Sequence, residues 1–226
     1  MNFKKVLKDQ FGYSKFKANQ EEIIKSLISG SDVFAAMPTG GGKSICYQLP
    51  SVLLEGITIV VSPLVALMKD QVDEAVDNGL AAAFINSSMA PEEASSVYSS
   101  LYRGEIKLLY LSPERLALEG YYEKLQQLPV KLFAVDEAHC LSEWGHDFRP
   151  DYLGLSKIKK YFPGVPVAAF TATATEKVQT DIIRILKLKK PLTIRASFNR
   201  PEIFYRVENK QKALPQIAGF INNRRD

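Results

Sequence analysis

The sequence contains little cysteine and no long apolar run. Cys46 and Cys140 are the only two cysteines among 226 residues, and neither lies in a CxxC pair or at a zinc-ligand spacing from histidines. No segment reaches the ~20 apolar residues of a membrane span, and the first residues lack the apolar stretch of a signal peptide. We therefore expect reduced thiols, no zinc in this segment, no membrane partner and a cytoplasmic location of the bacterial type.

The sequence also has only a small excess of positive over negative charge. The net charge is +4 and the isoelectric point is near 8.9, which is compatible with a nucleic-acid partner but excludes a polybasic, histone-like binder. Internal repeats and low-complexity tracts are absent. An apolar content of 46% over this length is sufficient for the core of one large α/β domain.

Short apolar runs recur along the chain, and each is followed by a turn signal and an amphipathic segment of helix length. This alternation predicts an α/β fold with a mostly parallel central sheet and helices on both faces. The expected strands are Val33–Ala36, Ile57–Val61, Ala82–Ile85, Lys107–Leu111, Leu132–Val135, Val167–Phe170 and Leu192–Ile194. The clearest helices are expected at Asn19–Ser29, Leu64–Asp77 and Pro91–Tyr102, each stopped by a nearby glycine.

The alternation breaks at Phe198-Asn199-Arg200-Pro201. An extended segment over Ile203–Val207 and a lone helix over Ala213–Asn222 are expected beyond it, without a following strand. We therefore predict one domain over residues 1–205, and a linker and first helix over 206–226 that lead into a truncated second domain.

A glycine-rich segment follows the first expected strand and opens a helix, as a phosphate-binding loop requires. Its residues are Met37, Pro38, Thr39, Gly40, Gly41, Gly42, Lys43 and Ser44. Three glycines let backbone N–H groups surround a triphosphate. Lys43 can reach the β and γ phosphates of ATP, and the Ser44 hydroxyl can bind Mg²⁺. The consensus is only partly met, because Met37 stands where its first glycine is usual.

Two acidic residues directly follow the strand expected at Leu132–Val135. This position is expected to place their carboxylates at the carboxyl edge of the sheet, beside the phosphate-binding loop. Asp136 is expected to hold Mg²⁺, and Glu137 to orient and deprotonate the water that attacks the γ phosphate. His139 is expected to relay the nucleotide state to Thr171 and Thr173. Alternatively, the pair is a helix cap or solvated turn, and His139 an ordinary turn histidine.

An aromatic-rich segment follows, with π faces on Trp144 and Phe148 and donors on His146 and Arg149. That combination suits stacking on single-strand bases and holding phosphates, although Trp144 is also compatible with a core position. Two further segments each follow a strand, so their hydroxyls and backbone amides are expected to face a DNA backbone. Their marker residues are Ser62, Pro63, Ser112 and Arg115, and each segment alone is equally a helix N-cap signal.

The segment Asp136–Tyr152, which reads DEAHCLSEWGHDFRPDY, resembles the signature of the RecQ helicases. Other stretches agree in order, so the resemblance covers nearly the whole chain: Phe11-Gly12-Tyr13, Ser62-Pro63-Leu64, Ser112-Pro113-Glu114-Arg115, Phe170–Thr175 and Phe198–Pro201. It implies a RecA-like P-loop NTPase domain of the DEAH-box class, the first of two in a helicase. Such a domain drives 3′ to 5′ unwinding of DNA in repair and recombination, on single-stranded or forked substrates.

The resemblance also implies that Gln20 reads adenine while Tyr13 and Lys17 flank its ring. The family usually has arginine in place of Lys17, and a guanidinium stacks on a purine better than an ammonium does. Ala18-Asn19 departs from the usual Pro-Gly. The arginine finger of the family lies in the second RecA-like domain of the same chain, and its zinc and winged-helix modules follow beyond Asp226. The segment alone is therefore expected to bind ATP and hydrolyse it slowly.

Three other functions fit parts of the pattern. A nucleotide-gated clamp would bind nucleic acid without unwinding it. An RNA helicase would share the same core, because nothing here reads a 2′-hydroxyl. A small-molecule P-loop kinase would need an acceptor-binding lid, and the DEAH box disfavours it.

Overall fold

The computed structural model describes residues 2–197, 203, 207 and 209–222. Within them the chain forms a seven-stranded sheet in the order β3-β4-β2-β5-β6-β1-β7, and every pairing is parallel. The strands are β1 (Val33–Ala36), β2 (Ile57–Val61), β3 (Ala82–Ile85), β4 (Leu108–Leu111), β5 (Val130–Val135), β6 (Val167–Thr171) and β7 (Leu192–Arg195).

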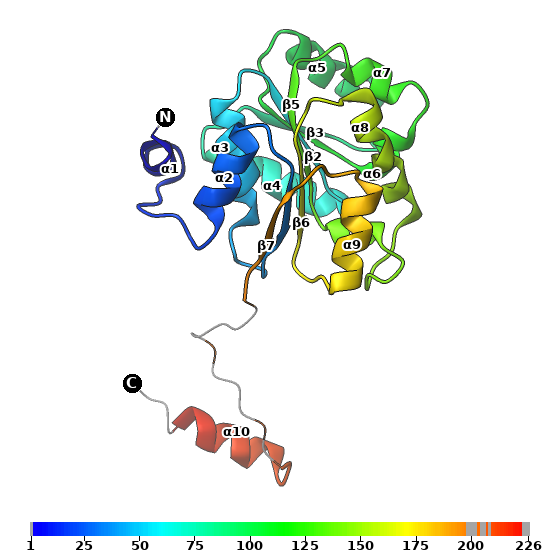
Figure 1. Ribbon diagram of the computed structural model, residues 1–226. Coiled ribbons are helices and arrows are strands. Elements are labelled where there is room, and N and C mark those ends of the chain that lie inside the picture. The colour runs from blue at the N-terminus through cyan, green and yellow to red at the C-terminus, as the bar shows by residue number, and fades with distance from the viewer. Residues whose placement is uncertain (1, 198–202, 204–206, 208, 223–226) are drawn as a thin grey trace.

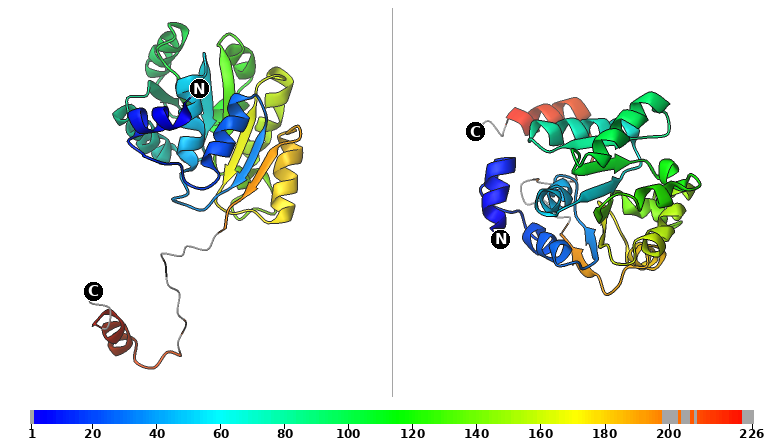
Figure 2. Two further views of the ribbon diagram at one scale, coloured as in Figure 1. Left: turned by 60° about the vertical axis from the view of Figure 1, so that its left-hand side comes forward. Right: turned by 90° about the horizontal axis from the view of Figure 1, so that it is seen from above.

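Two helical layers sandwich the sheet (Figures 1 and 2). One layer is formed by α1 (Phe3–Phe11), α2 (Gln20–Ile28), α3 (Lys43–Leu53) and α4 (Val65–Asp77). The other is formed by α5 (Pro91–Tyr102), α6 (Pro113–Ala117), α7 (Tyr121–Leu125), η1 (Ala138–Leu141), η2 (Pro150–Lys157), α8 (Ile158–Tyr161) and α9 (Glu176–Ile185). Because helices cover both faces of the sheet, its central strands consist of continuous apolar runs. All residues of β1, β2 and β4 are buried.

The parallel strands bring their carboxyl ends to one edge, which we call the carboxyl edge. There Ala36 of β1 pairs with Thr171 of β6, and Val61 of β2 pairs with Val135 of β5. The phosphate loop follows β1 and the acidic pair follows β5, with only β6 between these two strands. The sheet order therefore places loop and acids at the same edge.

The opposite end of the sheet is fastened by a buried ion pair. Asp32 is 4% exposed and lies just before β1; its Oδ1 accepts from the Lys159 ammonium at 2.6 Å and from the Val167 amide at 2.9 Å. Its Oδ2 accepts from the Lys189 amide at 2.7 Å. One carboxylate thus joins β1, β6, the segment before β7 and the helix that carries Lys159.

The expected strands and helices are confirmed to within two residues, and the sheet is parallel throughout. The predicted break at 198–201 and most of the extended segment at 203–207 lie outside the described residues. Helix α10 (Ala213–Asn222) forms where a lone helix was expected, has no buried residue and lies apart from the sheet in Figure 1 and in the left view of Figure 2. None of the described helices is long and apolar enough to cross a bilayer.

Candidate nucleotide and nucleic-acid site

The phosphate loop has a backbone that only glycine tolerates. Gly40 and Gly42 adopt the left-handed conformation, with φ of 76° and 77°. A Cβ on Gly41 would lie 2.8 Å from the Pro38 carbonyl oxygen, and one on Gly42 would collide with the Gln20 amide. Gly42 is also the N-cap residue of α3 and supplies no side-chain cap. The first N–H groups of α3 are therefore left free of a side-chain cap and would face an anion bound at the positive end of the helix.

Two side chains, one from the first residue of α2 and one from the segment before it, hold the outer side of this loop. The Gln20 amide nitrogen donates to the Gly42 carbonyl at 2.9 Å, and its oxygen accepts from the Lys17 amide at 2.8 Å. The Lys17 ammonium donates to the Gly40 carbonyl at 2.7 Å. Gln20 keeps one N–H and one lone pair for a further partner. Tyr13, 53% exposed, has its ring available to a ligand, so the predicted adenine contacts stay predictions.

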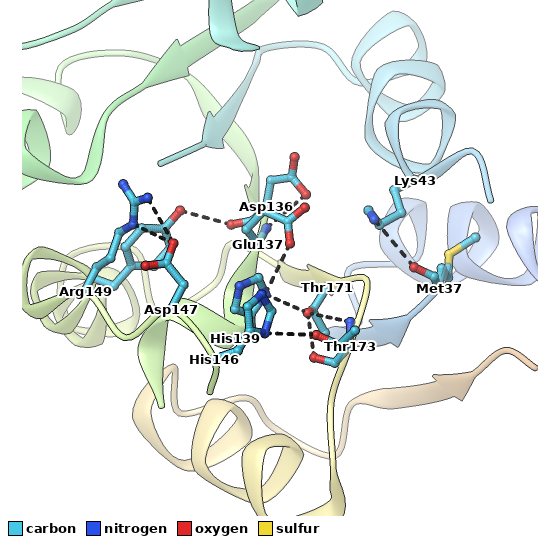
Figure 3. Close-up of polar contacts among 11 residues, drawn as sticks. Met37, Lys43, Asp136, Glu137, His139, His146, Asp147, Arg149, Thr171 and Thr173 are labelled. Atoms are coloured by element: carbon cyan, nitrogen blue, oxygen red, sulfur yellow. Dashed lines mark hydrogen bonds and ion pairs between the residues drawn. The ribbon is translucent and has the colours of Figure 1, made fainter. Parts of the chain in front are cut away.

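The acidic pair lies opposite the phosphate loop (Figure 3). The Asp136 amide continues the ladder by donating to the Val61 carbonyl at 2.9 Å. Glu137 has a φ of 44°, a conformation that is strained for a side chain of its kind and turns the chain away from the strand. Lys43 projects into the space that both carboxylates face, and its charge favours their ionised forms.

The pKa values of the two carboxyl groups are shifted in opposite directions. Burial raises the pKa of Asp136, and the neighbouring Glu137 carboxylate raises it further. A hydrogen bond from His139 lowers the pKa of Glu137, with a further contribution from Lys43. Glu137 is therefore ionised at neutral pH, whereas Asp136 is a buried carboxylate whose charge a nearby cation would stabilise.

This donor set fits Mg²⁺. Asp136 supplies a carboxylate, Ser44 a hydroxyl, and the buried Oε1 of Gln71 has no hydrogen-bond partner among the described residues. All three are hard oxygen donors of the kind that Mg²⁺ prefers, with phosphate oxygens and water completing its shell. The described residues contain no group of three His, Cys, Asp or Glu that could hold a metal ion without a nucleotide. A metal ion that is shared with a nucleotide needs fewer protein ligands, because phosphate oxygens and water complete its coordination.

A chain of hydrogen bonds leads from Glu137 to β6 and beyond (Figure 3). The His139 Nδ1 lies 3.2 Å from a Glu137 carboxylate oxygen and 3.0 Å from the Thr171 hydroxyl. That hydroxyl donates to the Thr173 carbonyl at 2.9 Å, so it must accept from His139, and Nδ1 carries the proton. The Thr173 hydroxyl lies 3.3 Å from His146 Nδ1.

The aromatic-rich segment, residues 142–149, folds back on this chain. The ring of His146 stacks on that of His139 with centroids 4.0 Å apart, and the Ser142 hydroxyl donates to Asp181 of α9 at 2.9 Å. Trp144 is 63% exposed, so the alternative that it belongs to the core is wrong. The Lys177 ammonium of α9 lies 3.0 Å from the centre of its ring, a cation–π contact that covers one face of the indole.

The other predicted nucleic-acid residues are not all brought together. Arg149 is anchored to the Pro63 carbonyl at 3.0 Å and to Asp147, while Phe148 is half-buried beside it. Ser62, Pro63 and Ser112 are buried. The Ser112 hydroxyl caps α6 by accepting from the Arg115 amide, so this segment forms the helix N-cap that was considered as an alternative. Because these side chains are buried, only the backbone groups of the two segments could contact DNA, and that contact stays a prediction. The Arg115 side chain lies against residues of α5 and α7.

Sequence reasoning missed two residues of this site. Lys177 covers Trp144, but it lies in the first turn of an ordinary amphipathic helix, α9, and gives no signal of its own. Tyr152 donates from its buried hydroxyl to the Asp136 carbonyl at 3.1 Å and so supports the turn at the acidic pair. A buried tyrosine usually needs a hydrogen-bond acceptor, but the sequence does not say which one.

Comparison with known proteins agrees with this geometry. The DEAD/DEAH box helicase family matches residues 17–182. The chain is 45% identical over 216 residues to the ATP-dependent DNA helicase RecQ of Haemophilus influenzae, covering 96% of this chain and 35% of that protein. It is 46% identical over 212 residues to the probable ATP-dependent DNA helicase RecS of Bacillus subtilis, covering 93% and 42%. The chain thus spans well under half of the length of these relatives.

Solved structures share the fold at lower identity. A hypothetical ATP-dependent RNA helicase from Sulfolobus tokodaii superimposes with a TM-score of 0.66 at 20% identity, over 87% of this chain and 57% of that one. The DUF1998 helicase MrfA, bound to DNA and AMPPNP, gives 0.67 at 16% identity, over 87% and 29%. At these identities the likeness establishes a RecA-like helicase fold and nothing finer. The chain belongs to the DEAD/DEAH box helicase family, and the curated relatives that resemble it at about 45% identity are RecQ helicases.

Proposed function

We propose that this chain is the ATP-binding motor domain of a RecQ-type, 3′ to 5′ DNA helicase that acts in DNA repair and recombination. The observation that carries the proposal is the placement of Lys43 across from Asp136 and Glu137, with His139 joining that pair to the aromatic-rich segment. The names of the relatives support DNA over RNA as the polymer.

The proposed chemistry is hydrolysis of ATP. The N–H groups at the start of α3 and the Lys43 ammonium bind the phosphates, and Ser44 and Asp136 hold Mg²⁺, which neutralises phosphate charge when bound. Glu137 orients the attacking water and accepts its proton. Because the pKa of Glu137 is lowered, it is a weak base, and orientation of the water is the larger part of its role.

The proposed coupling runs through His139. Any shift of Glu137 on nucleotide binding changes the acceptor of the His139 Nδ1 proton, and Thr171 is the competing acceptor 3.0 Å away. The stacked His146 then transmits the change to the segment that carries Trp144. Single-stranded DNA would bind by stacking its bases on the indole ring of Trp144. Lys177 covers one face of that ring, so a base would stack on the opposite face or displace Lys177.

The proposed partners are single-stranded or forked DNA and a second RecA-like domain of the same protein. Residues 1–205 form the first domain in this proposal, and 206–226 lead toward the second. That domain would supply the arginine finger that stabilises the transition-state charge. The chain by itself is therefore expected to bind ATP and to hydrolyse it slowly.

Replacement of His139 by alanine tests this function. The variant should bind a fluorescent ATP analogue as the unmodified chain does. The stimulation of its steady-state ATPase by a dT oligonucleotide should fall about tenfold, a change within the usual range of coupling between two sites. Thr171→Val should reproduce the loss, and Thr171→Ser, which keeps the hydroxyl, should not. Undiminished stimulation in His139→Ala would contradict the coupling, and fast DNA-stimulated turnover by this chain alone would contradict the need for a second domain.

A further inference from the structure

Three buried polar groups between α3 and the sheet have no hydrogen-bond partner among the described residues. They are the hydroxyls of Tyr47 and Tyr110 and the side-chain amide nitrogen of Gln48. All three residues are at most 2% exposed. Leaving such a group unpaired is unfavourable, and folded proteins seldom do so. Three of them close together therefore need a physical explanation.

Helix α3 and strand β4 bring these groups into one row that ends at the phosphate loop. Ser44, Tyr47 and Gln48 are spaced by three and four residues on α3, so they share one face of that helix. Helical side chains lean toward the amino end of their helix, which directs the Tyr47 ring toward Ser44. Tyr110 of β4 meets the Tyr47 ring nearly edge to face, with centroids 6.4 Å apart.

Both tyrosines are hydrogen-bond donors. Burial raises the pKa of Tyr47 well above its ordinary value, and it raises that of Tyr110 to about 12. The Asp136 carboxylate raises both pKa values further, so the two hydroxyls lie within electrostatic reach of the acidic pair. Each tyrosine therefore keeps its proton, and each O–H group needs an acceptor.

One directed chain of hydrogen bonds would satisfy all three groups. The Tyr110 hydroxyl has Gln48 and Tyr47 as polar neighbours, and the Tyr47 hydroxyl has Tyr110 and Ser44. When the Gln48 amide nitrogen donates to the Tyr110 oxygen, the Tyr110 proton is directed to Tyr47. The Tyr47 proton is then directed to Ser44. The opposite direction fails at Gln48, because its unpaired group is an amide nitrogen, which only donates.

We propose that Tyr47 is a positioning residue for Ser44, and that in the complex with Mg²⁺ and nucleotide its hydroxyl donates to the Ser44 oxygen. The proposal rests on the proposed function, in which Ser44 is a ligand of Mg²⁺. The Ser44 oxygen has two lone pairs. A hydrogen bond from Tyr47 occupies one of them and thereby turns the other toward the metal. Tyr110 and Gln48 in turn hold the Tyr47 hydroxyl in place.

Titration of the chain with a fluorescent ATP analogue, with and without Mg²⁺, tests the proposal in Tyr47→Phe, which removes only the hydroxyl. The gain in affinity that Mg²⁺ provides should fall about three- to tenfold, in keeping with the loss of one hydrogen bond. The affinity without Mg²⁺ should not change. Tyr110→Phe should cause a smaller loss in the same direction. In Ser44→Ala, which removes the metal ligand itself, adding Tyr47→Phe should have no further effect.

Urea unfolding of the nucleotide-free chain separates this role from a purely structural one. Tyr122→Phe is the matched control, because Tyr122 is a tyrosine only 3% exposed whose hydroxyl donates to the Gly154 carbonyl at 3.0 Å. This control should lower the urea midpoint and leave the Mg²⁺ effect intact. Tyr47→Phe should leave the midpoint unchanged or raise it, because it removes a hydroxyl that has no partner among the described residues.

The outcomes distinguish this proposal from the proposed function. A full Mg²⁺ effect in Tyr47→Phe, alongside a reduced one in Ser44→Ala, would overturn the role of Tyr47 alone. The same conclusion would follow if Tyr47→Phe caused a further loss in the Ser44→Ala background, or lowered the urea midpoint as far as Tyr122→Phe does. Absence of any Mg²⁺ effect in the unmodified chain would overturn both proposals.

Discussion

Replacement of Glu137 by glutamine is expected to lower the rate of ATP hydrolysis about 10²- to 10³-fold, within the usual contribution of a positioned general base. Glutamine keeps the size of the side chain and the strained φ of 44°, so the fold should not change. It removes the carboxylate that would orient the attacking water and accept its proton. The affinity for ATP should change little, because Lys43 and the N–H groups at the start of α3 still bind the phosphates.

Single-turnover hydrolysis and equilibrium binding, measured on the same preparation, check this prediction. Glu119→Gln is the matched control, since it makes the same chemical change at an exposed position after α6. Hydrolysis by Glu137→Gln at the rate of the control would remove Glu137 from the mechanism. A parallel loss of ATP binding would instead assign it to binding.

Replacement of Asp32 by asparagine is expected to reduce the free energy of unfolding by about 3–5 kcal/mol, the usual loss when one member of a buried ion pair is removed. The side chains of Asp32 and Lys159 are only 4% and 8% exposed. Asparagine can still accept from the Val167 amide, but it leaves the Lys159 ammonium buried without a counter-charge. The double variant Asp32→Asn/Lys159→Met should be more stable than Asp32→Asn, because no unpaired charge is left.

Urea unfolding followed by far-UV circular dichroism measures this difference. Glu21→Gln is the matched control, because it breaks the exposed Glu21–Lys25 pair on α2, whose side chains are 37% and 58% exposed. Pairs of that kind contribute about 0–1 kcal/mol. If Asp32→Asn and Glu21→Gln lowered stability equally, the buried pair would not be the fastening that the structure indicates.

Much of the fold was predictable because the sheet is covered on both faces. Strands such as β1 and β2 are then continuous apolar runs, and they stand out between amphipathic helices. The position of the acidic pair followed from the same reasoning, since parallel strands end at one edge. The 3₁₀ helices η1 and η2 were not predicted, because their residues carry no period that distinguishes them from a loop.

The contacts that could not be predicted join segments far apart in sequence. Nothing in the surroundings of Asp32 points to Lys159, and nothing near Trp144 points to Lys177. Ser62 and Ser112 illustrate the opposite problem: their polar side chains, placed after strands, suggested exposure, but tertiary packing buries both. Nor does the sequence indicate that the Arg115 guanidinium lies 5.6 Å from the centre of the Tyr121 ring of α7, and its predicted contact with DNA stays a prediction.

The central claim is that Mg²⁺ and ATP bind between the phosphate loop and the acidic pair. Titration of the chain with a fluorescent ATP analogue, with and without Mg²⁺, tests it most directly. We predict binding that Mg²⁺ strengthens, an affinity about 10–100-fold weaker in Lys43→Ala, in keeping with the loss of a charge-assisted contact, and a smaller Mg²⁺ effect in Asp136→Asn. Equal affinities in all three proteins, independent of Mg²⁺, would contradict the account.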